Sequence, residues 1–121
     1  MVGSFKQKPW GYEKILAHED GYVVKEIFVK AGAQLSLQYH EEKVESMTLV
    51  HGKGAMLYRS LRTCRTGEPG KLSKMVKFRP YFIRPGRVHR LCATTEDIKV
   101  IEVSSDQLDD VVRLEDDYGR V

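Results

Sequence analysis

The sequence has few cysteines, little excess of one charge and no long apolar run, and each shortage excludes a class of protein. Its two cysteines, Cys64 and Cys92, are too few for a disulfide framework and lack CxxC spacing, so we interpret them as free thiols in a reducing compartment. The 20 basic and 17 acidic residues leave a net charge of +3, too small and too dispersed to indicate a nucleic-acid partner. No stretch is long enough to span a membrane, and the N-terminal segment MVGSFKQKPWGYEK lacks the apolar core of a secretory signal. We therefore expect a cytoplasmic protein with no membrane partner.

A long helical period is also missing, and short segments typical of β-strands occupy the chain instead. These segments are rich in β-branched and aromatic residues or alternate apolar with polar residues, and they cover 22–30, 34–39, 46–51, 55–60, 71–78, 80–83, 89–93 and 98–103. Gly52-Lys53-Gly54 is expected to form a tight hairpin, and residues 61–70 an exposed loop or long hairpin tip. Short strands at near-even spacing predict an antiparallel barrel or sandwich.

A chain of 121 residues can bury one core, so we expect a single domain over residues 1–121. Its core strands are expected at about 22–103, with an N-terminal strand at 6–16 and a C-terminal strap at 104–121. Within the strap, apolar residues of the segment 106–115 have mixed spacing, so a short helical turn and an extended segment both fit.

Four polar side chains form the strongest functional pattern. Gln38 and His40 are two residues apart, so on a strand they project from the same face. Glu45 follows across a predicted turn, and His89 comes shortly after the turn Pro85-Gly86. Imidazole and carboxylate groups suit a first-row divalent metal, and a neutral amide oxygen is a weaker ligand that leaves the metal more Lewis-acidic. The pattern predicts one metal site inside the barrel, with zinc as the first expectation and manganese, iron, cobalt or nickel as alternatives.

Two of these ligand assignments have alternatives. Glu42 could take the place of Glu45 as the carboxylate ligand, and Gln38 could hydrogen-bond a metal-bound water instead of binding the metal. The other two histidines, His18 and His51, fit no motif position and are expected at the surface.

The spacing G-x5-Q-x-H-x4-E-x6-G, followed by G-x2-H, resembles the two sequence motifs of the cupins. A glutamine at the first ligand position, where most cupins have histidine, is similar to the type II phosphomannose isomerase (mannose-6-phosphate isomerase) domain. Four further segments match that family, and together they reach from Lys8 to Arg120: KPWG at 8–11, GAQLSLQ at 32–38, PGRVHRL at 85–91 and the C-terminal segment 101–120.

This resemblance implies a single-domain antiparallel cupin barrel, also called a double-stranded β-helix or jelly-roll. It also implies carbohydrate metabolism, namely the metal-dependent interconversion of mannose 6-phosphate and fructose 6-phosphate through an enediol. Many family members join this domain to a nucleotidyltransferase domain that this sequence does not contain, so no guanylyltransferase activity is expected. The family usually carries a histidine-rich run where this chain has His40-Glu41-Glu42-Lys43, which places Glu42 where a histidine is common.

An aldose–ketose isomerisation needs an electrophile, a group that moves a proton between two carbons, and a clamp for the phosphate. The metal would supply the electrophile. Glu42 and Lys43 are the ionisable candidates for proton transfer, with Glu41 and a metal-bound water as alternatives and Arg90 beside the site. Arg90 and Arg120 are expected to bind the phosphate, because a guanidinium group binds phosphate bidentately.

Two other functions also fit the sequence. One is a cupin isomerase or epimerase acting on another sugar, which the altered run after Gln38 favours. The other is a non-catalytic carbohydrate-binding cupin. Cupins commonly pair through N-terminal strands or sheet edges, so a homodimer is expected, with the segment Lys8–Leu16 as its contact.

Overall fold

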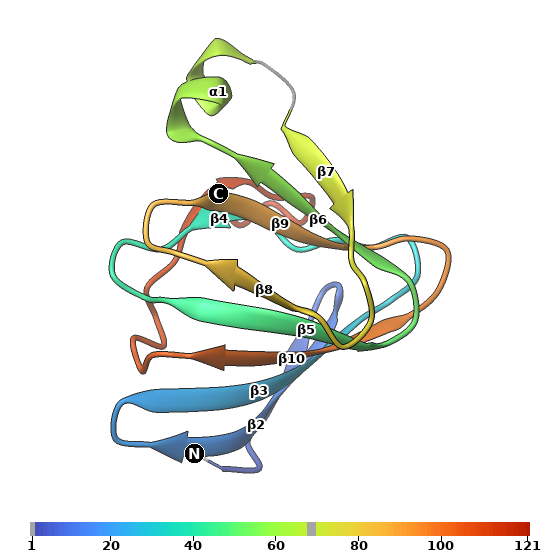
Figure 1. Ribbon diagram of the computed structural model, residues 1–121, viewed down its shortest axis with the longest axis vertical. Helices are drawn as coiled ribbons and strands as arrows, with labels where there is room; N and C mark the ends of the chain where they lie inside the picture. Colours follow the sequence, from blue (N-terminus) through green and yellow to red (C-terminus); the bar gives the residue numbers. More distant parts are fainter. Residues whose placement is uncertain (1, 68–69) are drawn as a thin grey trace.

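The computed structural model describes residues 2–67 and 70–121, and it folds them into two antiparallel sheets that face each other (Figure 1). One sheet has the strand order β1-β2-β3-β10-β5-β8 and the other has the order β11-β4-β9-β6-β7. The strands of the first sheet are β1 (Phe5–Lys8), β2 (Gly11–Glu19), β3 (Tyr22–Val29), β5 (Glu45–His51), β8 (Pro80–Ile83) and β10 (Ile98–Ser104). Those of the second are β4 (Leu37–Tyr39), β6 (Gly54–Arg59), β7 (Lys71–Lys74), β9 (Val88–Ala93) and β11 (Val112–Glu115). The all-β antiparallel architecture predicted from the sequence is confirmed.

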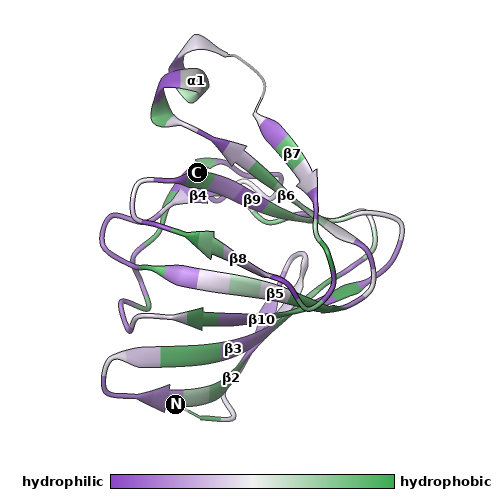
Figure 2. Cartoon of the chain, in the orientation of Figure 1, coloured by the Kyte–Doolittle hydropathy of each residue, from purple (hydrophilic) through white to green (hydrophobic). Residues whose placement is uncertain are grey.

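The interior lies between the two sheets, and alternate residues of each strand point into it. Along β5 the buried positions are Glu45, Met47 and Leu49, separated by half-buried residues. Figure 2 shows the result, with β5 hydrophilic near its start and hydrophobic further along. The strands therefore enclose an apolar core at one end of the interior and polar side chains at the other.

The turn at Gly52-Lys53-Gly54 differs from its prediction as a tight hairpin. The strand before it, β5, pairs with β10 and β8, whereas the strand after it, β6, pairs with β9 and β7. The turn therefore carries the chain from one sheet to the other. Gly52 has a φ of +83°, and a Cβ at this position would lie 2.1 Å from the backbone oxygen of Asp97. Only glycine fits this corner without a backbone shift.

The segment predicted as a loop or hairpin tip contains the short helix α1 (Leu61–Thr66). Leu61 and Cys64 are three residues apart and both half-buried, which gives this helical turn one partly buried face. Residues 68 and 69 of the segment lie outside the described residues. The strand predicted over 71–78 ends at Lys74, where β7 ends.

The two ends of the chain also differ in part from their predictions. The single N-terminal strand expected at 6–16 is instead a hairpin of β1 and β2, in which Lys8 pairs with Gly11. Pro9 lies in the turn, because a proline has no N–H with which to continue a strand ladder. In the C-terminal segment 106–115, residues 108–109 form a turn and residues 112–115 form β11, so the predicted extended form is confirmed for the last part of the segment. No helix among the described residues is long and apolar enough to cross a membrane.

Candidate metal centre

Three buried side chains from separate segments meet at the polar end of the interior. His40 follows β4, Glu45 begins β5 and His89 lies on β9. The Nε2 atoms of His40 and His89 each lie 3.1 Å from the same carboxylate oxygen, Oε1 of Glu45. The three side chains are almost fully buried, and their ligand atoms all lie within 4.8 Å of one another. The structure thus brings three of the four predicted ligands to one point.

Hydrogen bonds on the far side of each imidazole determine which ring nitrogen carries the proton. Nδ1 of His40 lies 2.6 Å from the backbone oxygen of Asp110, and Nδ1 of His89 lies 3.0 Å from that of Arg87. A carbonyl oxygen only accepts, so each Nδ1 must donate, and each neutral ring then has a lone pair on Nε2. Two nitrogen lone pairs and a carboxylate oxygen therefore face one another. Such an arrangement is stabilised when a cation lies between the three groups.

Two of the three distances between these atoms also fit a metal ion. Zinc binds nitrogen and oxygen ligands at about 2.1 Å, so at the angles of usual coordination its ligand atoms are roughly 3.0–3.4 Å apart. Both Nε2–Oε1 distances fall in this range. Nε2 of His89 is buried and has no hydrogen-bond partner among the described residues, as expected for a ligand atom that is directed at an ion. The residues present therefore fit a divalent metal.

Gln38, the fourth predicted ligand, lies on β4 directly opposite His89 on β9. Its half-buried side chain lines the same cavity as His40 and Glu45. Gln38 is therefore adjacent to the three converging groups, and its role as a direct ligand stays a prediction.

Asp110 in the C-terminal strap holds the turn that carries His40. Its carboxylate accepts hydrogen bonds from the backbone N–H groups of Glu41, Glu42 and Lys43 at 2.7–2.9 Å, and its backbone oxygen accepts the one from His40. The three N–H bonds hold the pKa of the Asp110 carboxyl group at about 2. Asp110 thus orients a predicted metal ligand from a position 70 residues away in the chain.

A buried ion-pair group lies behind the three converging side chains. Nζ of Lys43 lies 3.2 Å from Oε2 of Glu45 and 3.8 Å from Oε2 of Glu102. Burial, together with the nearby charge of Glu45, raises the pKa of Glu102 to about 8. Burial alone would lower the pKa of Lys43, but the charges of Glu102 and Glu45 raise it. Lys43, a predicted proton-transfer residue, is therefore buried beside a predicted metal ligand.

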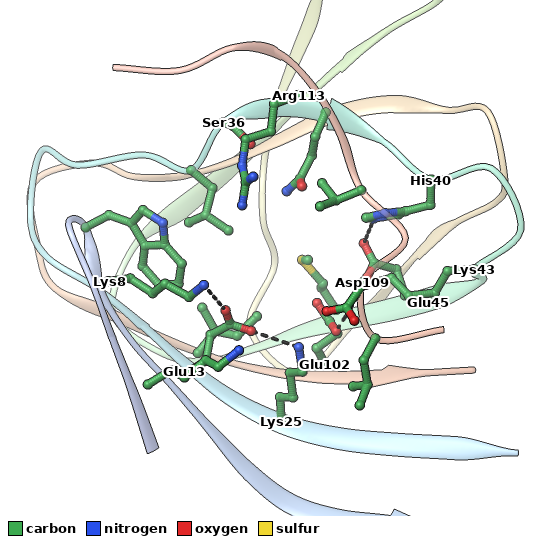
Figure 3. Close-up of a pocket in the computed structure, with 18 of the residues that line it drawn as sticks. Lys8, Glu13, Lys25, Ser36, His40, Lys43, Glu45, Glu102, Asp109 and Arg113 are labelled. Atoms are coloured by element: carbon green, nitrogen blue, oxygen red, sulfur yellow. Dashed lines mark hydrogen bonds and ion pairs between the residues drawn. The ribbon is translucent and has the colours of Figure 1, made fainter. Parts of the chain in front are cut away.

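These groups form one wall of a cavity of about 550 Å³ (Figure 3). On the opposite side Glu13 is paired with two lysines: its carboxylate oxygens lie 3.3 Å from Nζ of Lys8 and 2.9 Å from Nζ of Lys25. The C-terminal strap closes a further side with Leu108, Asp109, Val111, Arg113 and Arg120. A small polar ligand in this cavity would contact carboxylates, the imidazole of His40 and several cations.

The other predicted site residues have different positions. The side chain of Glu42 is exposed and does not line the cavity. Arg90 is buried outside the cavity lining, where its guanidinium donates to the backbone oxygens of Leu35 and Glu115. Arg120 does line the cavity, but it forms two hydrogen bonds with the Asp116 carboxylate at 2.8 and 2.9 Å.

Several residues of the site were absent from the sequence prediction, among them Glu102, Asp110 and Arg113. A signal for Glu102 exists, because it occupies an inward position of β10, in line with the buried Ile98 and Val100. Asp110 and Arg113 have no such signal, since the irregular spacing of the strap does not indicate which residues face the interior.

Comparison with known proteins supports these observations. The family model described as mannose-6-phosphate isomerase C-terminal matches residues 4–116. The alginate biosynthesis protein AlgA of Pseudomonas aeruginosa is 33% identical over 117 residues, which cover 93% of this chain and 22% of AlgA. The mannose-1-phosphate guanylyltransferase ManC of Salmonella typhimurium is 36% identical over 119 residues, which cover 94% of this chain and 22% of ManC. The chain therefore spans about a fifth of the length of these relatives.

Solved structures share the fold at low sequence identity. The capsular polysaccharide assembling protein CapF of Staphylococcus aureus matches with a TM-score of 0.75 and 18% identity, over 93% of this chain and 34% of CapF. KdgF of Halomonas sp. matches with a TM-score of 0.72 and 18% identity, over 88% of this chain and 90% of KdgF. At these identities the likeness shows the fold alone, the double-stranded β-helix of the cupins. With the family match over residues 4–116, the chain belongs to the cupin family of mannose-6-phosphate isomerase C-terminal domains.

Proposed function

We propose that this chain is a metal-dependent isomerase domain that interconverts mannose 6-phosphate and fructose 6-phosphate in the cytoplasm. The observation that carries the proposal is the convergence of His40, Glu45 and His89, whose lone pairs face one another beside a cavity that His40 and Glu45 line and that is large enough for a sugar phosphate. The family match supports this choice of reaction, because the matching family is described as mannose-6-phosphate isomerase C-terminal.

His40, Glu45 and His89 would hold the metal, with Gln38 beside them. When bound, the metal supplies Lewis acidity that stabilises the negative charge developing on the sugar oxygens as the enediol forms. The two imidazoles are already held in place, because the backbone oxygen of Asp110 accepts from His40 and that of Arg87 accepts from His89.

Proton transfer between the two carbons requires an acid–base group that faces the substrate. Glu102 lines the cavity, and its Oε2 atom is buried with no hydrogen-bond partner among the described residues. Lys43 lies 3.8 Å away and also lines the cavity. We assign proton transfer to this pair, with Oε2 of Glu102 as the atom that exchanges the proton. The exposed position of Glu42 argues against the part that the sequence suggested for it.

The test supplies purified protein with zinc, manganese, cobalt, iron or nickel and measures conversion of fructose 6-phosphate to mannose 6-phosphate. We expect turnover with at least one metal, and loss of both metal and turnover in His89→Ala. The matched control is His51→Ala, because His51 is exposed and lies outside the cavity. Absence of turnover with every metal, in protein shown to contain the metal, would overturn the proposal.

A homodimer in solution is also proposed. Strand β1 is an edge of its sheet, and Phe5 on this strand is 56% exposed, so the N-terminal hairpin offers both unpaired backbone groups and an apolar side chain. Sedimentation of the purified protein at micromolar concentration tests this, and a monomer would contradict it.

A further inference from the structure

Most cations that line the cavity already have a carboxylate partner. Lys8 and Lys25 share Glu13, and Lys43 lies between Glu45 and Glu102. Arg120 is bound through two nitrogens to Asp116. Lys6 also borders the cavity, but it lies on the exposed strand β1, where water surrounds its ammonium group. A paired or fully hydrated cation gains little by binding an anionic ligand.

Arg113 differs from these cations. It is half-buried on β11 and lines the cavity, and Figure 3 shows its side chain extending inward. Its Nε atom is buried with no hydrogen-bond partner, and the described residues place no carboxylate within ion-pair distance of it. The charge of Arg113 contributes to lowering the pKa of Asp116, but the Asp116 carboxylate is already hydrogen-bonded to Arg120. A buried guanidinium donor without a partner is destabilising unless a ligand accepts from it.

The sheet register relates Arg113 to the metal centre. Arg113 on β11 is directly opposite Gln38 on β4, and Gln38 is directly opposite His89 on β9. Residues directly opposite on adjacent strands point to the same face of the sheet. Neighbouring strands are ~4.8 Å apart, so the backbones of Arg113 and His89 are separated by roughly 10 Å. This separation suits a hexose phosphate that has its carbonyl end at the metal centre and its phosphate at Arg113.

We propose that Arg113 is the anion-binding residue of the cavity and that it selects sugars carrying a phosphate over neutral sugars. The naming of a sugar phosphate rests on the proposed function, whereas the anion site itself rests on the unpaired guanidinium. Arg113 replaces Arg90 and Arg120 as the phosphate clamp, because those two guanidinium groups are occupied by protein acceptors. A guanidinium group offers a planar pair of donors that matches two phosphate oxygens.

The experiment measures binding of inorganic phosphate to the metal-loaded protein by calorimetry, together with KM for fructose 6-phosphate. Removing a charge-assisted bidentate contact is expected to weaken phosphate binding and raise KM by about 10- to 100-fold in Arg113→Gln. Arg113→Lys keeps the charge but not the planar pair of donors, so an intermediate loss is expected. The charge-matched control is Lys14→Gln, because Lys14 is exposed and lies outside the cavity. Its effect should stay below about threefold, and circular dichroism and metal content should be unchanged in all variants.

The outcomes separate this proposal from the isomerase proposal. If the wild type binds phosphate and Arg113→Gln does not, the anion site stands even when no turnover is found with any metal. If Arg113→Gln binds phosphate with unchanged affinity, or if Lys6→Gln removes binding instead, the assignment of Arg113 is overturned while the isomerase activity can persist. Failure of the wild type to bind phosphate at all also overturns it. Should Arg113→Gln fail to fold, Arg113→Lys decides, since unchanged phosphate affinity in that variant would contradict bidentate recognition.

Discussion

The two ends of the barrel interior are built by the same strands yet differ in chemistry. Strand β10 directs Ile98 and Val100 into the interior at one end and Glu102 at the other, and β5 does the same with Leu49 and Glu45. Because side chains alternate with a period of two along a strand, the fold presents all these positions to the interior in the same way. Alternation along the strands therefore specifies the barrel, whereas the inward residues at the strand ends determine the chemistry of the site.

The two ends also contribute differently to stability. We call the apolar end, which contains Leu49, Ile98 and Val100, the closed end, and the polar end, which contains Glu45 and Glu102, the open end. Burial of apolar side chains stabilises the closed end. At the open end, Lys43, Glu45 and Glu102 are withdrawn from water, and the attraction of Lys43 to the two carboxylates offsets that desolvation only in part. The open end therefore depends on groups outside the strands, namely the strap residue Asp110 and, in the proposed function, the metal ion that His40, Glu45 and His89 would hold. Mutations at the two ends should separate stability from metal affinity.

The largest effect on stability is expected from a mutation at the closed end. Leu49 is 1% exposed, and Leu49→Ala should lower the free energy of unfolding by about 2–5 kcal/mol, because it removes apolar contacts and leaves a cavity. Metal affinity of the folded protein should be unchanged. Urea denaturation and a metal titration measure the two quantities. The matched control is Leu72→Ala on β7, since Leu72 is 64% exposed and should change stability by less than about 0.5 kcal/mol. A large loss of metal affinity in Leu49→Ala would contradict the separation of the two ends.

The largest effect on metal affinity is expected from Glu45→Gln at the open end. This change keeps the shape of the side chain but removes the anionic ligand that faces both imidazoles. Changing a residue that only hydrogen-bonds a metal ligand lowers metal affinity by about 10- to 100-fold, so removal of the ligand itself should lower it by more than about 100-fold. Elemental analysis and competition with a chelator measure this. Glu41→Gln is the control, because Glu41 is exposed. Full metal content in Glu45→Gln would show that another group is the carboxylate ligand.

The closed end and the meeting of His40, Glu45 and His89 could be predicted from the sequence because their signals are local. His40 and Gln38 share a strand face through their spacing of two residues, and both lie at the cavity. His89 follows the turn Pro85-Gly86 that precedes β9, and Glu45 begins β5 directly after the segment 41–44. The turn at residues 52–54 was predicted as a hairpin because glycines suit hairpins and corners equally. The choice between them depends on which sheet β6 joins, and that pairing is long-range.

The strap residues could not be predicted because their contacts depend on distant parts of the chain. Asp110 contacts residues 40–43, which precede it in the chain by 67 to 70 positions. The position of Arg113 follows from the pairing of β11 with β4, a strand of three residues whose own pattern is too short to indicate a partner. Arg90 was predicted in the site because it is next to His89, but adjacent residues on a strand point to opposite faces, so its guanidinium binds elsewhere.

A smaller effect on metal affinity is expected when the strap residue Asp110 no longer holds the segment after His40. Asp110→Ala removes the acceptor for three N–H groups of the turn after His40, so this ligand should lose its fixed orientation. Metal affinity should fall by about 10- to 100-fold, as measured by competition with a chelator. Asp110→Asn keeps one acceptor oxygen and should lose less. If Asp110→Ala binds metal as tightly as the wild type, the metal affinity of the open end does not depend on the strap.

The smallest effect on stability is expected from the ion pair between Asp116 and Arg120 near the end of the strap. The hydrogen bonds and charge of Arg120 hold the pKa of Asp116 at about 2, against an ordinary value of 3.8. A carboxyl group whose pKa is lower in the folded state stabilises fully above the unfolded value and loses this contribution as the pH falls through the folded one. The wild type should thus be more stable than Asp116→Asn above about pH 5, by less than about 1 kcal/mol. This difference should shrink steadily as the pH falls from about 4 to about 2. Thermal melts of both proteins from neutral pH down through this range measure it. A difference that is as large near pH 2 as near neutral pH would mean that Asp116 acts through packing rather than charge, and the strap would then resemble the closed end more than the open one.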